Sequence, residues 1–126
     1  MKKFDLERRL IEFSVSIIQI VDAIPNSKAG NHLGGQLVRS GTSVSLNYGE
    51  AQSAESRKDF IHKMKVILKE LRETYICIEL IRKANLFEQK EDLVAARKEN
   101  NELISIFVKS IETAHRNMQT SSGSKT

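Results

Sequence analysis

The chain of 126 residues has little of the residue types that punctuate or cross-link a fold. One Pro and six Gly are too few for the many turns of a β-sandwich or barrel. A single cysteine, Cys77, excludes an internal disulfide and a Cys-based zinc cluster. No apolar run is long enough to cross a membrane, and acidic residues interrupt the charged N-terminus, which is unlike a signal peptide. The sequence therefore predicts a cytoplasmic protein with no membrane partner.

Apolar residues recur at spacings of three and four along four segments, which is typical of amphipathic helices that pack together. The predicted helices cover residues 5–24, 33–50, 56–84 and 89–118. Short connections make consecutive helices antiparallel, so we expect an all-α, antiparallel up-down-up-down four-helix bundle spanning residues 1–119. Residues 120–126 have no apolar anchor, and we expect them to form a disordered tail.

The second predicted helix carries a row of small and polar residues beside its apolar stripe: Gln36, Ser40, Ser43, Asn47 and Glu50. Such residues let a neighbouring backbone come close and supply hydrogen bonds across the contact. Small hydroxyls and glycine are poor helix formers, which argues against a merely solvated face. We therefore expect a packed polar seam along this helix.

No catalytic constellation is visible, and we predict no enzymatic activity and no cofactor. Cys77 lies between apolar neighbours as a small buried side chain would. The enzymatic alternative is a di-metal carboxylate site, built from Asp59 with His62 and Glu112 with His115, and joined by Glu12 and Glu50. However, His62 and His115 lie off the inward-facing stripes, so we expect no metal.

The excess positive charge is confined to one stretch of the chain. Residues 57–72 hold six basic and two acidic side chains, whereas the rest of the chain has fourteen of each. One row in this stretch, spaced 4, 3, 4 and 3, lies opposite the core stripe: Lys58, His62, Lys65, Lys69 and Arg72. Such a row suits a phosphate backbone, although a solvated helix face is the alternative interpretation. No exposed aromatic residue is interleaved, so sequence-specific reading of a single strand is not predicted.

Three blocks of the sequence resemble a known family: residues 36–50 (QLVRSGTSVSLNYGE), 59–64 (DFIHKM) and 68–74 (LKELRET). These are the bacterial four-helix-bundle proteins encoded in intervening sequences of large-subunit ribosomal RNA genes. The accessory variability protein of diversity-generating retroelements belongs to the same group. The resemblance covers about residues 5–115. One departure is Tyr75-Ile76, which stands where the family often has an aromatic residue followed by Trp.

The resemblance implies a homopentameric ring with no known catalytic activity, and for the retroelement relative it implies RNA binding alongside a reverse transcriptase. It also implies structural roles, at contacts within and between protomers, for six positions: Arg39, Asn47, Glu50, Glu70, Glu73 and Thr74. On this basis we expect a non-enzymatic RNA- or DNA-binding accessory or scaffold protein. The alternative is a protein–protein interaction module that docks a partner such as a polymerase and binds no nucleic acid.

The positions of Arg39 and Glu70 suggest an ion pair. They lie fifteen and sixteen positions from the connection near residue 54, so on antiparallel helices they are nearly level. A guanidinium can meet a carboxylate there in a two-pronged contact. If the pair is sheltered, removal of Glu70 should cost about 3–5 kcal/mol, and if it is exposed only about 0–1 kcal/mol. We expect the sheltered pair, within a protomer or across a ring interface.

Overall fold

The computed structural model describes the backbone of residues 3–124 and the side chains of residues 5–119. It contains four helices: α1 (Lys3–Ala23), α2 (Lys28–Gln52), α3 (Arg57–Lys83) and α4 (Lys90–Ser124). No strand occurs among these residues. The predicted all-α class and the four predicted helices are therefore confirmed.

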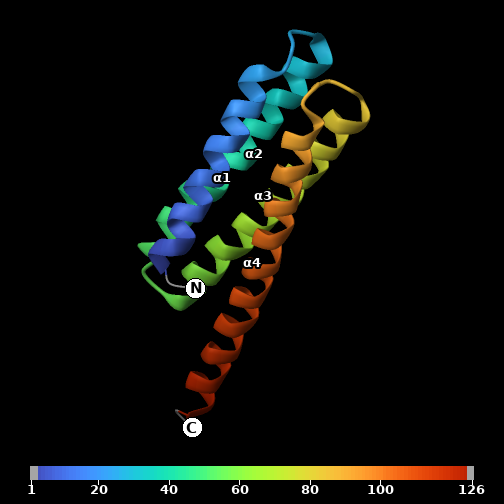
Figure 1. Cartoon of the computed structure of the whole chain (residues 1–126). Helices are drawn as coiled ribbons and strands as arrows, with labels where there is room; N and C mark the ends of the chain where they lie inside the picture. The colour runs from blue at the N-terminus through green and yellow to red at the C-terminus, as the bar shows by residue number, and fades with distance from the viewer. Residues whose placement is uncertain (1–2, 125–126) are drawn as a thin grey trace.

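Each helix runs opposite to the one before it, as an up-down-up-down order requires (Figure 1). Contacts join α1 to α2, α2 to α3, α3 to α4 and α4 to α1, and α1–α4 is the least extensive of these. Within residues 3–124, the backbones of helices on a diagonal do not approach each other closely, and their side chains meet in the core. The molecule is thus a bundle of two hairpins, α1–α2 and α3–α4, joined chiefly through α2 and α3.

The second helix begins earlier than its apolar pattern predicts, at Lys28 rather than near residue 33. Ser27 caps it, since its hydroxyl oxygen accepts a hydrogen bond from the backbone N–H of Gly30 at 2.9 Å. The first turn carries no periodic apolar side chain, and periodicity alone therefore misses it. The real connection between α1 and α2 is a short turn around Pro25.

The turn after α3 depends on Asn85, whose φ of 57° is in the left-handed region. Asparagine tolerates this conformation better than most residues. The backbone N–H of Leu86 then donates to the carbonyl of Ile81 at 3.1 Å, which closes the helix end. Phe87 follows and is buried. The apolar pair 86–87 therefore folds back over the end of the bundle.

Helix α4 continues past the ends of the other three helices (Figure 1). Its last buried residue is Ala114. The backbone of residues 120–124 is helical, although the sequence predicts a disordered tail there, and residues 125–126 lie outside the described range. Helical hydrogen bonds are internal to the segment, so a helix can continue beyond its last apolar contact.

The predicted apolar stripes form one core along the bundle axis. On α1, the stripe residues Leu6, Leu10, Phe13, Ile17 and Ile20 are buried. The core also holds an aromatic pair, because Phe107 of α4 meets Tyr48 of α2 edge to face with ring centroids 6.1 Å apart. Within residues 3–124, no helix combines the length and apolar character needed to cross a bilayer.

Helices α1 and α2 approach each other closely at Gly41. The hydroxyl of Ser14 donates to the carbonyl of Gly41 at 2.8 Å and lies 2.6 Å from the hydroxyl of Ser45. A Cβ atom at position 41 would stand 2.8 Å from Cγ2 of Ile17, which is fully buried. The α1–α2 contact therefore requires a residue without a side chain at this position.

Helices α3 and α4 are joined by polar contacts that have no local sequence signal. The side-chain amide of the buried Asn100 donates to the carbonyl of Leu71 at 2.9 Å. Closer to the turn, Arg97 and Arg82 both contact Glu79, at 3.0 Å and 2.9 Å. The hydrogen bond from Arg82, followed by that from Arg97, lowers the pKa of the Glu79 carboxyl below its usual value.

The α1–α4 seam is closed by a two-pronged ion pair. Arg9 donates to both carboxylate oxygens of Glu99 at 2.7 Å, and it lies 3.6 Å from Glu102. Roughly a third or less of each side chain in the Arg9–Glu99 pair is exposed, at 27% and 30%. This geometry is the stronger kind of surface ion pair.

We expect Gly41→Ala to lower the free energy of unfolding by about 1–3 kcal/mol, because the new methyl group would displace Ile17. Gly49→Ala is the matched control on the same helix, since no atom lies within 4 Å of a Cβ there. That control should gain about 0.5–1 kcal/mol from the helix preference of alanine. Urea unfolding measures both changes. Equal stability of the two variants would contradict the close α1–α2 approach.

Candidate nucleic-acid interface

The five residues of the predicted basic row lie on the solvent face of α3, where all of them are exposed: Lys58, His62, Lys65, Lys69 and Arg72. We call this row the basic ridge. The opposite face of the same turns carries Ile61, Met64 and Ile67, which are buried in the core. Core packing on one side of α3 therefore determines which way the basic ridge faces.

The members of the basic ridge have no carboxylate partner among the described residues, unlike the cations that join the helices. Among the described residues, no carboxylate pairs with any of its members, whereas Lys63 on the flank of the same helix lies 3.5 Å from Glu50. Arg9, Arg39, Arg82 and Arg97 are all paired across or within helices. The ridge charges are therefore available to an anionic ligand.

Two aliphatic side chains continue the line of the ridge toward the α3–α4 turn. Ile76 is 55% exposed and Leu80 is 49% exposed. They follow Arg72 at spacings that keep them on the same solvent face of the helix. The outer face of α3 is therefore basic in its first half and apolar in its second half.

Of the row on α2 predicted to form a polar seam, Ser40 is the residue buried against α3. The hydroxyls of Ser40 and Thr74 are 2.8 Å apart, and the Thr74 hydroxyl is also 2.8 Å from the carbonyl of Glu70. Both side chains are fully buried. A buried hydroxyl needs a partner, and each of these supplies one to the other across the helix contact.

Arg39 makes the predicted contact with Glu70 and also reaches Glu73. Its Nη1 lies 3.3 Å from the Glu70 carboxylate, and its Nη2 contacts the Glu73 carboxylate. The Arg39 side chain is 51% exposed. The Glu70 side chain is only 12% exposed, so within one chain the pair is sheltered on one side and lies between the cases of about 3–5 kcal/mol and about 0–1 kcal/mol.

The remaining predicted seam residues do not form a packed row, and Gln36 is exposed. The amide of Asn47 donates to the carbonyl and the hydroxyl of Ser43, one turn earlier, at 2.9 Å and 2.8 Å. Glu50 is exposed and pairs with Lys63 of α3. The structure therefore brings Arg39, Ser40, Glu70, Glu73 and Thr74 together, and it leaves Ser43 and Asn47 bonded within α2.

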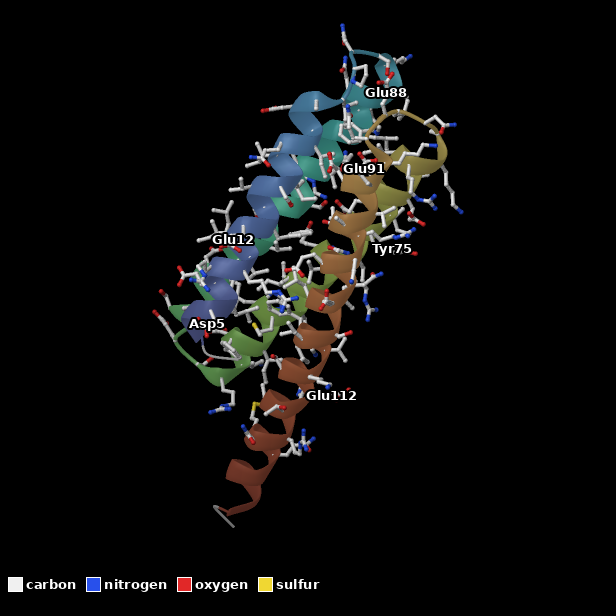
Figure 2. All side chains as sticks on the ribbon, in the orientation of Figure 1. Asp5, Glu12, Tyr75, Glu88, Glu91 and Glu112 are labelled. Carbon is white, nitrogen blue, oxygen red and sulfur yellow. The ribbon has the colours of Figure 1, made fainter. Side chains whose placement is uncertain are left out.

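The residues considered for a di-metal site do not converge. Figure 2 shows Glu12 and Glu112 on opposite outer sides of the bundle. His62 is exposed on the basic ridge, and His115 is only half-buried on α4. In the described part of the chain, no group of three or more His, Cys, Asp or Glu residues could hold a metal ion.

Two further titratable groups are controlled by burial. Burial raises the pKa of the Cys77 thiol, with Arg39 acting weakly in the other direction. Burial is also the main cause that raises the pKa of Tyr48, and the nearby Glu7 adds to it. Both groups therefore stay neutral near pH 7, which suits a structural role in the core.

The half-exposed Arg39 side chain and its longer contact with Glu70 predict weak coupling between the two residues. A double-mutant cycle of Arg39→Ala and Glu70→Ala should give a coupling energy of no more than about 1 kcal/mol, measured by urea unfolding. The same cycle on Arg9 and Glu99 is the comparison, and its coupling should be larger because one guanidinium there meets both oxygens of one carboxylate at 2.7 Å. Coupling of several kcal/mol at Arg39–Glu70 would mean that another surface shelters the pair in solution.

Comparison with known proteins agrees with this geometry. No curated protein matches the chain. A crystal structure of a protein of unknown function from the S23 ribosomal protein family of Bacteroides thetaiotaomicron is similar, with a TM-score of 0.80 and 29% sequence identity. The match covers 89% of this chain and 99% of that one. The family model described as 23S rRNA-intervening sequence protein matches residues 2–115. The chain therefore belongs to the family of 23S rRNA-intervening sequence proteins.

Proposed function

We propose that this protein is a non-enzymatic, oligomeric accessory or scaffold protein that binds RNA through the basic ridge of α3. The observation that carries the proposal is that Lys58, Lys65, Lys69 and Arg72 are exposed in one row without a carboxylate partner among the described residues. The family is named for an intervening sequence of 23S rRNA, which makes RNA the first ligand to test and DNA the second. A cytoplasmic location is part of the proposal.

The spacing and charge of the basic ridge favour contacts with the phosphate backbone of a nucleic acid. Row neighbours on a helix lie about 5–6 Å apart, so one ridge can meet several successive phosphates of a strand. Four Lys and Arg contacts should give a slope of log affinity against log salt of about −3. Contacts to phosphates position a nucleic acid without reading its sequence. Binding through the ridge is therefore weak, sensitive to salt and tolerant of sequence.

Charge reversal of the ridge tests the proposal. We expect the variant with Lys58, Lys65, Lys69 and Arg72 changed to Glu to lose RNA binding at low salt while its helical circular dichroism is unchanged. The matched control reverses three lysines and one arginine that are exposed elsewhere: Lys28, Lys90, Lys98 and Arg116. Both variants have the same net charge. An equal loss in both, or no retention of RNA by the unmodified protein, would contradict binding through the ridge.

We also propose that the protein assembles as a homopentameric ring. Among residues 5–119, the exposed large apolar side chains fall into two sets, one on each hairpin. The α1–α2 set is Ile11, Val15, Ile18 and Leu46, and the α3–α4 set is Ile76, Leu80 and Val94. Contact between unlike surfaces of neighbouring copies forms a ring when the rotation from copy to copy closes. The number five comes from the family resemblance. A ring would also repeat the basic ridge around its surface.

Complementary variants test the ring. Native mass measurement of the unmodified protein should give five times the 14.3 kDa of one chain. Val15→Lys and Ile76→Lys should each prevent ring closure, because each removes one of the two surfaces. An equimolar mixture should form a one-to-one dimer, since each variant keeps the surface that the other needs. A monomeric unmodified protein at micromolar concentration, or a mixture that stays monomeric, would contradict this assembly.

The exposed apolar sets also support the second candidate function, a module that docks a protein partner such as a polymerase without binding nucleic acid. Apolar surface of this kind marks protein contacts more often than nucleic-acid contacts. Capture of partners from native lysate with and without nuclease separates the two functions. A partner retained after nuclease treatment favours the docking module, and a partner lost with the nucleic acid favours the RNA-binding protein.

A further inference from the structure

A groove of about 460 Å³ lies between α3 and α4 at the end of the bundle where the basic ridge begins. Its floor is apolar and consists of the buried side chains of Leu6, Tyr48 and Met64. Arg57 and Phe60 line it from α3, and Lys109 lines it from α4. A size of this order suits a small organic ligand.

The charged side chains that line the groove are all positive. Arg57 and Lys109 are both exposed cations, and neither pairs with a carboxylate of the described residues. No acidic residue is among the described side chains that line this groove. Neutral hydrogen-bonding groups complete the α4 wall: Ser110, Thr113 and Asn117. The lining therefore complements an anion that also carries hydrogen-bonding atoms.

Phe60 gives the groove an aromatic surface. Although its spacing predicts a core residue, it is only partly buried and packs at the edge of the core. It also lines an adjoining hollow of about 490 Å³, together with Arg57 and Gln52, whose far side is formed by Glu55 and Ser56. An aromatic side chain reached from two hollows can stack on a planar ring, and every nucleobase offers one.

We propose that this groove binds one nucleotide unit, with its base against Phe60 and its phosphate held by Arg57 and Lys109. Charge complementarity, the aromatic wall and the size of the groove all favour this ligand. Arg57 directly precedes Lys58, the first residue of the basic ridge, so an RNA strand on the ridge can place an unpaired nucleotide in the groove. Binding of a nucleotide that belongs to an RNA strand rests on the proposed RNA binding by the ridge. Binding of a free nucleotide in the groove does not depend on that proposal.

The test uses 2-aminopurine riboside monophosphate, whose fluorescence falls when its base stacks. Titration of the full chain should give saturable quenching below about 1 mM ligand. Phe60→Leu, which keeps an apolar side chain but removes the ring, should weaken binding about tenfold. Lys109→Gln should weaken it several-fold, and the control Lys98→Gln, on an exposed face of α4, should leave it unchanged. Absence of saturable quenching, or equal effects of Lys98→Gln and Lys109→Gln, would overturn the groove.

A second arm separates free nucleotide from RNA and keeps the two proposals independent. A short RNA with one internal 2-aminopurine flanked by paired segments is titrated into the unmodified protein, Phe60→Leu, and the ridge double variant Lys65→Gln with Lys69→Gln. The ridge variant should lose RNA affinity and keep mononucleotide binding. If the protein retains RNA but quenches neither probe, nucleotide binding in the groove is contradicted and RNA binding through the ridge is supported. If the mononucleotide is quenched but RNA is not retained, nucleotide binding in the groove is supported and RNA binding through the ridge is contradicted.

Discussion

The arrangement of the bundle depends on how closely α2 can approach both of its neighbours. Two adjacent residues make this possible, since Gly41 faces α1 with no room for a Cβ and Ser40 faces α3 beside Thr74. Close packing on two sides fixes the rotation of α2, and α2 in turn fixes the rotation of α3. The direction in which the basic ridge faces follows from that chain of contacts. A small residue on one helix thus determines the exposed chemistry of another.

Charge in this protein divides into two groups with different surroundings. Arg39 joins α2 to α3, Arg97 joins α4 to Glu79 of α3, and Arg9 joins α1 to Glu99 of α4. These three cations form ion pairs with carboxylates of other helices. The cations of the ridge and of the adjoining groove have no such partners among the described residues. Because residues 57–72 hold six basic and two acidic side chains and the rest of the chain is balanced, the net charge of +4 comes from the first part of α3.

Much of the fold could be predicted because it rests on local spacing. The apolar stripes predict the four helices, and the same periodicity predicts that Lys65 and Lys69 face solvent. Counting back from the α2–α3 turn also predicts the Arg39–Glu70 contact, but not its exposure, which depends on the neighbouring side chains. The groove was not predicted, since Arg57 and Lys109 come from distant parts of the chain and Phe60 has the spacing of a core residue. The early start of α2 was missed because a capping serine, not an apolar pattern, defines it.

Among the described residues, four pairs of helices pack backbone against backbone. Three of these pairs are neighbours in sequence, and the fourth, α1 with α4, is the least extensive. Most of the native structure can therefore form by hairpin closure over short loops, which is the topology associated with fast folding. The contacts of Arg9 with Glu99 and Glu102 bridge 90 positions of the chain or more, so closing them has a large loop-closure entropy. Hairpins α1–α2 and α3–α4 can each be complete before the ends of the chain meet. The seam between the first and last helices is then the last part of the bundle to form and the first to open.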